Sequence, residues 1–128
     1  MATAAVYSGG NTAKPVTDDL TWRNSVATGV TAHAGGGQTD ATLLAAGINE
    51  VATVATAADS VKLPVPVVGL RVVVINSSAN SMQVFGSGTD TINAVATGTG
   101  VAHAAGKTAE YVAITSGTAA KWFRLLSA

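Results

Sequence analysis

The sequence predicts an all-β protein: a single small antiparallel β-sandwich or jelly-roll-like barrel with an extended N-terminal arm. From residue 41 onward, short runs rich in β-branched residues are separated by Gly, Asn, Asp and Pro at the spacing typical of sandwiches and barrels. The chain has 128 residues, which fits one domain. Hydrophobic residues make up 48% of the chain but aromatic residues only 5%, so we expect a core built from small side chains.

The extended arm is predicted over residues 1–40. A glycine pair at 9–10 and a glycine triplet at 35–37 interrupt a segment rich in Thr and Ala that has no sustained periodicity. Trp22 stands out there, because a tryptophan contributes most when it is buried against another surface. It could pack on its own domain as a first strand or dock on a neighbouring subunit. The arm residues predicted to dock are Tyr7, Leu20, Trp22 and Arg23.

The sandwich domain is predicted over residues 41–128, with eight strands and no helix. The Ala-rich segment 41–58 could form a helix, but Gly47 and several β-branched residues favour a strand. Turn residues at 76–80 and 86–90 predict hairpin connections, and the prolines at 64 and 66 predict a corner between sheets. The predicted strands are 42–44, 48–54, 60–63, 70–76, 82–85, 100–104, 109–115 and 121–126.

Two of these strands carry apolar residues on both faces. Along residues 70–75 the side chains opposite Val72 include Val73 and Ile75, and the adjacent Trp122 and Phe123 must point to opposite faces. A strand that is apolar on both faces must be covered on both. The arm or another protomer in a closed symmetric assembly could supply the second cover. We therefore expect a symmetric homo-oligomer with interface residues Val73, Ile75 and Phe123.

Composition and charge disfavour several classes of partner. Charged residues make up 11% of the chain, and 7 basic residues balance 7 acidic ones. A nucleic-acid partner would require a basic surface, whereas a net charge near zero favours association. The absence of cysteine excludes thiolate chemistry. No apolar run approaches the roughly 20 residues of a membrane-spanning helix, and no secretory signal is visible, so we expect synthesis in a cytoplasm.

Reactive residues are present but do not form a recognisable catalytic or metal site. Residues 105–108 (AGKT) match the end of a phosphate-binding loop, but Val101 stands where its first glycine should be and a strand follows. His33 and His103 have no ligand-type residues at metal-binding spacing. The remaining acidic candidates fit solvated or turn positions; they are Asp18, Asp19, Asp40, Asp59 and Asp90. We expect no enzyme activity, no cofactor and no metal.

Several segments follow one another in a distinctive order: 54–64 (VATAADSVKLP), 69–76 (GLRVVVIN), 83–85 (QVF), 88–93 (GTDTIN), 105–109 (AGKTA) and Trp122. In this order they resemble the small β-rich virion proteins of tailed bacteriophages, which include capsid decoration (cement) proteins and related head-fibre and tail-fibre modules. The resemblance covers about 60% of the chain. It implies a structural virion protein that has no catalytic residues.

Within that family, a decoration protein of the phage head is favoured. A fibre module is normally joined to a long shaft or coiled coil, and none follows the last predicted strand. The resemblance then implies a homotrimer that binds to the major capsid protein on the outside of the head. The alternative is a receptor- or glycan-binding module of a tail fibre or spike, which would use exposed aromatic residues. Tyr7, Trp22, Tyr111 and Trp122 are available, although their apolar neighbours favour packing.

Overall fold

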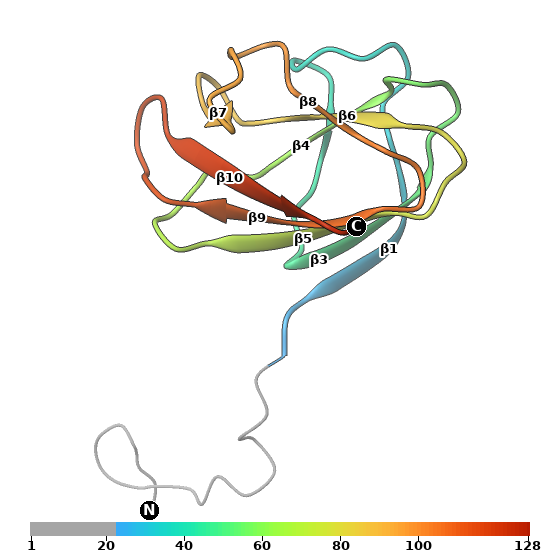
Figure 1. The fold of residues 1–128 in the computed structure, drawn as a ribbon, viewed down its shortest axis with the longest axis horizontal. Coiled ribbons are helices and arrows are strands. Elements are labelled where there is room, and N and C mark those ends of the chain that lie inside the picture. The colour runs from blue at the N-terminus through green and yellow to red at the C-terminus, as the bar shows by residue number, and fades with distance from the viewer. Residues whose placement is uncertain (1–22) are drawn as a thin grey trace, which may run out of the picture.

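The computed structural model describes residues 23–128, which form two facing β-sheets without a helix (Figure 1). The all-β prediction is therefore confirmed for this part of the chain. The strands are β1 (Val26–Thr31), β2 (Thr42–Leu43), β3 (Ile48–Thr53), β4 (Ser60–Lys62), β5 (Arg71–Asn76), β6 (Met82–Phe85), β7 (Thr91–Ile92), β8 (Val101–His103), β9 (Thr108–Ala113) and β10 (Lys121–Leu126).

The two sheets are mixed, so the prediction of an antiparallel sandwich is wrong. One sheet has six strands in the order β1-β3-β5-β9-β10-β7, and the other has four in the order β2-β4-β6-β8. The pairs β1–β3, β3–β5, β2–β4, β4–β6 and β7–β10 are parallel. The pairs β5–β9, β9–β10 and β6–β8 are antiparallel.

The parallel pairs arise because the chain alternates between the sheets. From β1 to β6, every odd-numbered strand lies in the larger sheet and every even-numbered strand in the smaller one. Each turn of this coil places a new strand beside the equivalent strand of the previous turn, in the same direction. The connections at 77–81 and 86–90 consequently cross between sheets, so the hairpin predictions for 76–80 and 86–90 are wrong. The crossover predicted at 64–66 is confirmed, because these residues join β4 to β5.

Each of the eight predicted strands has a counterpart, and two further strands were not predicted. One is the short β7. The other is β1, which lies within the predicted arm but forms an edge of the six-stranded sheet. Residues 1–22 lie outside the described part, so the arm remains a prediction there.

A β-bulge explains why β1 belongs to the sheet despite its weak pattern. The register with β3 shifts between Ala27 and Val30, at Gly29, whose φ is +66°. This extra residue turns Val30 back toward the core, where it packs against the buried cluster, and Ala32 follows it there. Glycine suits the position because a left-handed conformation is costly for residues with a Cβ.

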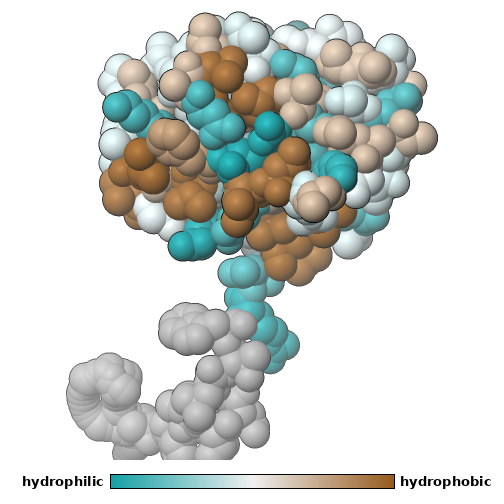
Figure 2. Space-filling view, viewed as in Figure 1, coloured by the Kyte–Doolittle hydropathy of each residue, from teal (hydrophilic) through white to brown (hydrophobic). Residues whose placement is uncertain are grey.

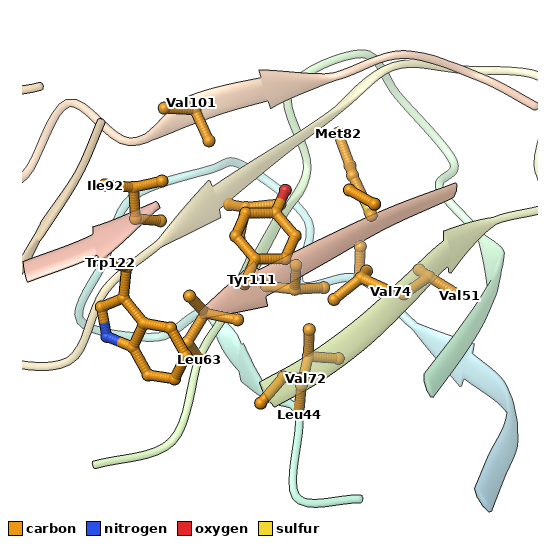
Figure 3. Close-up of a cluster of buried hydrophobic side chains, with 14 of the residues drawn as sticks. Leu44, Val51, Leu63, Val72, Val74, Met82, Ile92, Val101, Tyr111 and Trp122 are labelled. Carbon is orange, nitrogen blue, oxygen red and sulfur yellow. The ribbon is translucent and has the colours of Figure 1, made fainter. Parts of the chain in front are cut away.

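The core lies between the sheets and consists mainly of small branched side chains, as predicted (Figure 3). Its largest fully buried members are Trp122 and Tyr111. Alternate residues along β5, Val72 and Val74, also point into it and are almost completely buried. The residues that alternate with Val72 and Val74 along β5 point to the outer face of the larger sheet.

Asx residues join successive turns of the coil at one end of the sandwich. Asp59, in the β3–β4 connection, accepts hydrogen bonds from the Thr56 amide at 3.0 Å and from the Gly35 amide at 3.2 Å, and Gly35 lies one turn earlier in the β1–β2 connection. One turn later, the Asn80 side-chain amide donates to the carbonyls of Val54 and Ala55 at 2.8 and 3.2 Å. Each connection is thus fastened to the one before it.

Candidate functional site

The outer face of the six-stranded sheet carries a row of five side chains, one from each of five neighbouring strands. The strand register aligns Val26, Ile48, Val73, Glu110 and Leu125 in that order. Four of the five are apolar, and the two at the ends are strongly exposed: Val26 at 61% and Leu125 at 72%. We call these five residues the sheet-face row.

Further apolar side chains flank this row on the same face. Phe123 on β10 aligns with Val112 on β9, and Phe123 is 46% exposed. Ile75 lies beyond Val73 on β5 and is half-buried. Figure 2 shows brown surface along the lower side of the molecule, where Figure 1 places β3, β5, β9 and β10. The larger sheet therefore presents an apolar outer face.

The acidic side chains on this face have partners within the chain. Glu110 pairs with Arg71, with 3.0 Å between Oε1 and Nη1. Glu50 accepts hydrogen bonds from the Ser77 hydroxyl at 2.8 Å and from the Gly29 amide at 3.4 Å. The Arg71 side chain of this pair is 65% exposed, so solvent screens the interaction and the pair adds little to stability. Its importance is that both charges are already matched on the face itself.

The sheet edges, in contrast, are poorly suited to pairing with another strand. The Gly29 bulge interrupts β1, and the Glu50 side chain occupies the Gly29 amide. On the edge strand β8, the Ala102 carbonyl accepts a hydrogen bond from Arg124 Nη1 at 2.6 Å. The edge strands β2 and β7 have only two residues each. Bulges, capped groups and short strands are the usual ways of preventing edge-to-edge association.

The outer face of the smaller sheet is more polar and partly covered by loops. Lys62 donates to the Thr39 carbonyl, and Gln83 donates to the Thr99 carbonyl. Phe85 is 3% exposed even though it alternates with the core residue Val84. The two outer faces therefore differ, and the apolar one belongs to the six-stranded sheet.

A second apolar surface lies on the β4–β5 connection, at the left end of the view in Figure 2. Val65, Val67 and Val68 are exposed by 75%, 67% and 63%. The connection is fixed by hydrogen bonds from the Leu70 amide to the Val67 carbonyl and from the Gly69 amide to the Ala113 carbonyl. We call Val65, Val67 and Val68 the valine loop.

A shallow hollow of about 350 Å³ adjoins the valine loop. Val65 and Pro66 form its apolar side, and residues 87–90 with 117–118 form its polar side. The Asp90 carboxylate there accepts a hydrogen bond from the Ala120 amide at 2.9 Å, which holds two of these connections together. This bond gives Asp90 a structural role.

The structure places the predicted interface residues in different situations. Val73, Ile75 and Phe123 lie on one face. The alternation predicted a shared face for Val73 and Ile75 and opposite faces for Trp122 and Phe123, and the strand pairing brings the three together. Arg23 is exposed ahead of β1, whereas Tyr7, Leu20 and Trp22 lie outside the described residues. The sequence interpretation missed Val26, Leu125 and the valine loop. The alternation that selected Phe123 also contained the signal for Leu125.

A buried His–Tyr pair is the most reactive-looking cluster inside the domain. His103 Nδ1 and Tyr111 Oη are 3.0 Å apart, and His103 Nε2 lies 2.9 Å from the Lys107 carbonyl oxygen. Because that carbonyl can only accept, Nε2 carries the proton and Nδ1 accepts from the Tyr111 hydroxyl. Both side chains are fully buried, so the pair joins the two sheets and has no access to substrate.

Burial also sets the protonation states of this pair. Desolvation lowers the pKa of His103 below 6.5; the Lys107 carbonyl opposes this, and the positive charge of Arg124 adds to it. Desolvation raises the pKa of Tyr111 to about 12, against the opposing effect of Arg124. Both groups are therefore neutral at physiological pH.

The other sequence candidates for chemistry occupy structural positions. Residues 105–107 form the turn between β8 and β9, as predicted, although Lys107 is half-buried and contacts the Ala128 carbonyl. His33 bridges Ser60 through backbone hydrogen bonds. Across residues 23–128, no three His, Asp or Glu side chains gather at metal-binding distance. This part of the chain also contains no helix long and apolar enough to span a bilayer.

The burial of two aromatic residues removes part of the support for glycan binding. Tyr111 and Trp122 have no exposed surface, so neither can stack on a sugar ring. The other two aromatic candidates, Tyr7 and Trp22, are not among the described residues. Comparison with known proteins provides no independent assignment: no protein-family model, curated protein or solved structure matches this chain.

Proposed function

We propose that this protein is a structural virion protein, a capsid decoration protein that binds the outside of an assembled phage head and stabilises the shell. Its partners are the major capsid protein and further copies of itself, with a homotrimer as the predicted assembly. The proposal combines the family resemblance with one structural observation. A small domain without strong net charge carries two separate exposed apolar surfaces, the sheet-face row and the valine loop.

Two apolar surfaces suit a subunit that joins neighbours. A protein that cements a shell must contact at least two partners at once, and each contact must exclude water. Exposed apolar clusters are typical of interaction sites. Binding that exists only in the assembled shell stabilises that state by mass action. The protected sheet edges support the same function, because they oppose uncontrolled strand addition.

The proposal is tested by mixing the full chain with shells assembled from the major capsid protein of the same virus. We expect saturable co-sedimentation at a fixed ratio to capsid subunits, together with a higher melting temperature of the shell. A folded protein that neither sediments with the shells nor changes their melting temperature would overturn the proposal. Binding to host envelope or immobilised glycan in its place would favour the receptor-binding alternative.

Variants identify the surface that contacts the shell. Val67→Asp places a charge on the valine loop, and Leu43→Asp places the same charge on β2, where Leu43 is also exposed. We expect at least a tenfold weaker shell affinity for Val67→Asp and little change for Leu43→Asp, because an unpaired charge is costly at a buried contact. Equal affinities would exclude the valine loop from the shell contact.

A further inference from the structure

We infer that the occupant of the sheet-face row is a second copy of this chain. The inference rests on the proposed function only in requiring an assembled protein, and it concerns a contact that can form without a shell. It identifies which of the two apolar surfaces joins the copies to one another. Three features of the face support a second copy: its charge balance, its size and the protection of the sheet edges.

The charges on this face balance one another. Arg71 and Glu110 form an ion pair, Glu50 keeps its negative charge while accepting hydrogen bonds from Ser77 and Gly29, and the exposed Lys121 on β10 adds one positive charge. The face therefore carries two charges of each sign, and a partner with a large net charge of either sign would leave charges unpaired, which is costly at a buried contact. A strongly charged partner would meet no excess of opposite charge on this face. A neutral, largely apolar surface is the best match, and the same face of another copy is such a surface.

The size of the face is sufficient for the centre of an interface between two copies. The sheet-face row crosses five strands, and neighbouring strands lie about 4.8 Å apart, so it is about 19 Å long. The six-residue strands β1, β3, β5, β9 and β10 extend the face by about 20 Å in the other direction. These two lengths enclose about 380 Å² of sheet, roughly half of the 800 Å² that each partner contributes to a standard protein interface, so the face can form the central part of such an interface.

The edges of the two sheets indicate that copies associate through the sheet face and not by pairing of edge strands. Strand addition is disfavoured by the bulge in β1, the capped carbonyl of β8 and the shortness of β2 and β7. Packing through the face remains open, and facing sheets pack about 10 Å apart with interdigitated side chains. Phe123 and Leu125 on β10, with Val26 on β1, supply the most exposed apolar groups for such packing.

The test measures the mass of the full chain by sedimentation velocity, without shells, over a range of concentrations. We expect the wild-type protein to be an oligomer of the 12.6 kDa chain. Leu125→Asp should weaken self-association at least about 100-fold, because an unpaired carboxylate would be buried in the contact. Leu43→Asp is the matched control, since Leu43 is exposed on the other sheet, and it should leave the mass unchanged.

Val26→Asp tests the other end of the row and should act as Leu125→Asp does. It also covers the case in which Leu125→Asp fails to fold. A monomeric wild-type protein would overturn the inference, even if another part of the same chain, such as residues 1–22, covered the row. Oligomers unaffected by both row variants, or equally disrupted by Leu43→Asp, would also overturn it. An oligomer that does not bind to assembled shells would overturn the proposed function but would leave this inference intact.

Discussion

The Tyr111 hydroxyl donates a hydrogen bond to Nδ1 of His103 across the interior, and this bond connects the six-stranded sheet to the four-stranded one. His103 is fixed from its other side by the Lys107 carbonyl. The two buried polar side chains therefore satisfy each other in a core that otherwise consists mostly of aliphatic groups. Such a pair is costly to break, because the remaining partner would stay buried without a hydrogen bond.

Tyr111→Phe should accordingly destabilise the fold. The ring still fills its space, but Nδ1 of His103 loses its donor. We expect the free energy of unfolding to fall by about 1–3 kcal/mol, the cost of an unsatisfied buried acceptor. Urea denaturation at pH 7.5 measures the change. A loss below about 0.5 kcal/mol would mean that this hydrogen bond contributes little to stability.

Protonation of His103 should make stability depend on pH. The folded state lowers the pKa of His103 below 6.5, whereas the unfolded chain titrates near 6.5, so the unfolded state binds more protons below that pH. The contribution of His103 is complete above pH 6.5 and is lost as the pH falls through the folded pKa. The midpoint of urea denaturation should therefore decrease as the pH is lowered from 7.5 to 5.5. His33→Gln should retain this decrease and His103→Gln should lose it; the reverse result would contradict the assignment.

Asn80 and Asn93 provide a matched test of the coil contacts. The Asn80 amide nitrogen donates to the carbonyls of Val54 and Ala55, whereas the Asn93 oxygen accepts from the Arg124 amide. The substitution Asn80→Asp would place a carboxylate against two carbonyls, so we expect the free energy of unfolding to fall by about 2 kcal/mol.

Asn93→Asp keeps its acceptor and should change the free energy of unfolding by less than about 0.5 kcal/mol. Thermal unfolding monitored by circular dichroism compares the two variants. Equal losses would show that the Asn80 bonds do not fasten the turns of the coil.

The alternation of side chains could be predicted from the sequence because it depends only on local geometry. Trp122 and Phe123 must point to opposite faces of any strand, and the structure buries the first and exposes the second. The same rule separated Val72 from Val73. It placed Val73 and Ile75 on one face of their strand and Phe123 opposite Trp122. That the three share one outer face follows from the strand pairing, which alternation does not predict.

The sheet pairing could not be predicted in the same way. Residues such as 76–80 favour a turn whether the chain returns in the same sheet or crosses to the other one. The β1 strand was missed because Gly29 breaks its alternation, and its pairing depends on the distant β3. One signal was present in the sequence: Ala-Asp-Ser at 58–60 and Ala-Asn-Ser at 79–81 stand in equivalent connections of successive turns.

Two glycines before β8 should respond differently to substitution by alanine. Gly98 and Gly100 have φ values of +83° and +69°, and both substitutions therefore cost about 1–2 kcal/mol of backbone strain. A Cβ at Gly98 would meet no atom within 4 Å, whereas one at Gly100 would lie 2.7 Å from the Val84 carbonyl oxygen and 3.0 Å from the Phe85 ring.

Gly100→Ala should therefore lower the free energy of unfolding by about 3 kcal/mol or more, which is about twice the loss expected for Gly98→Ala. The additional loss arises because β8 must move away from β6, and that movement disturbs the pairing of Val101 with Val84. Urea denaturation of both variants beside the wild type measures the difference. An equal loss in the free energy of unfolding for both variants would mean that β8 can move away from β6 without destabilising the fold. That result would contradict the close packing of these strands.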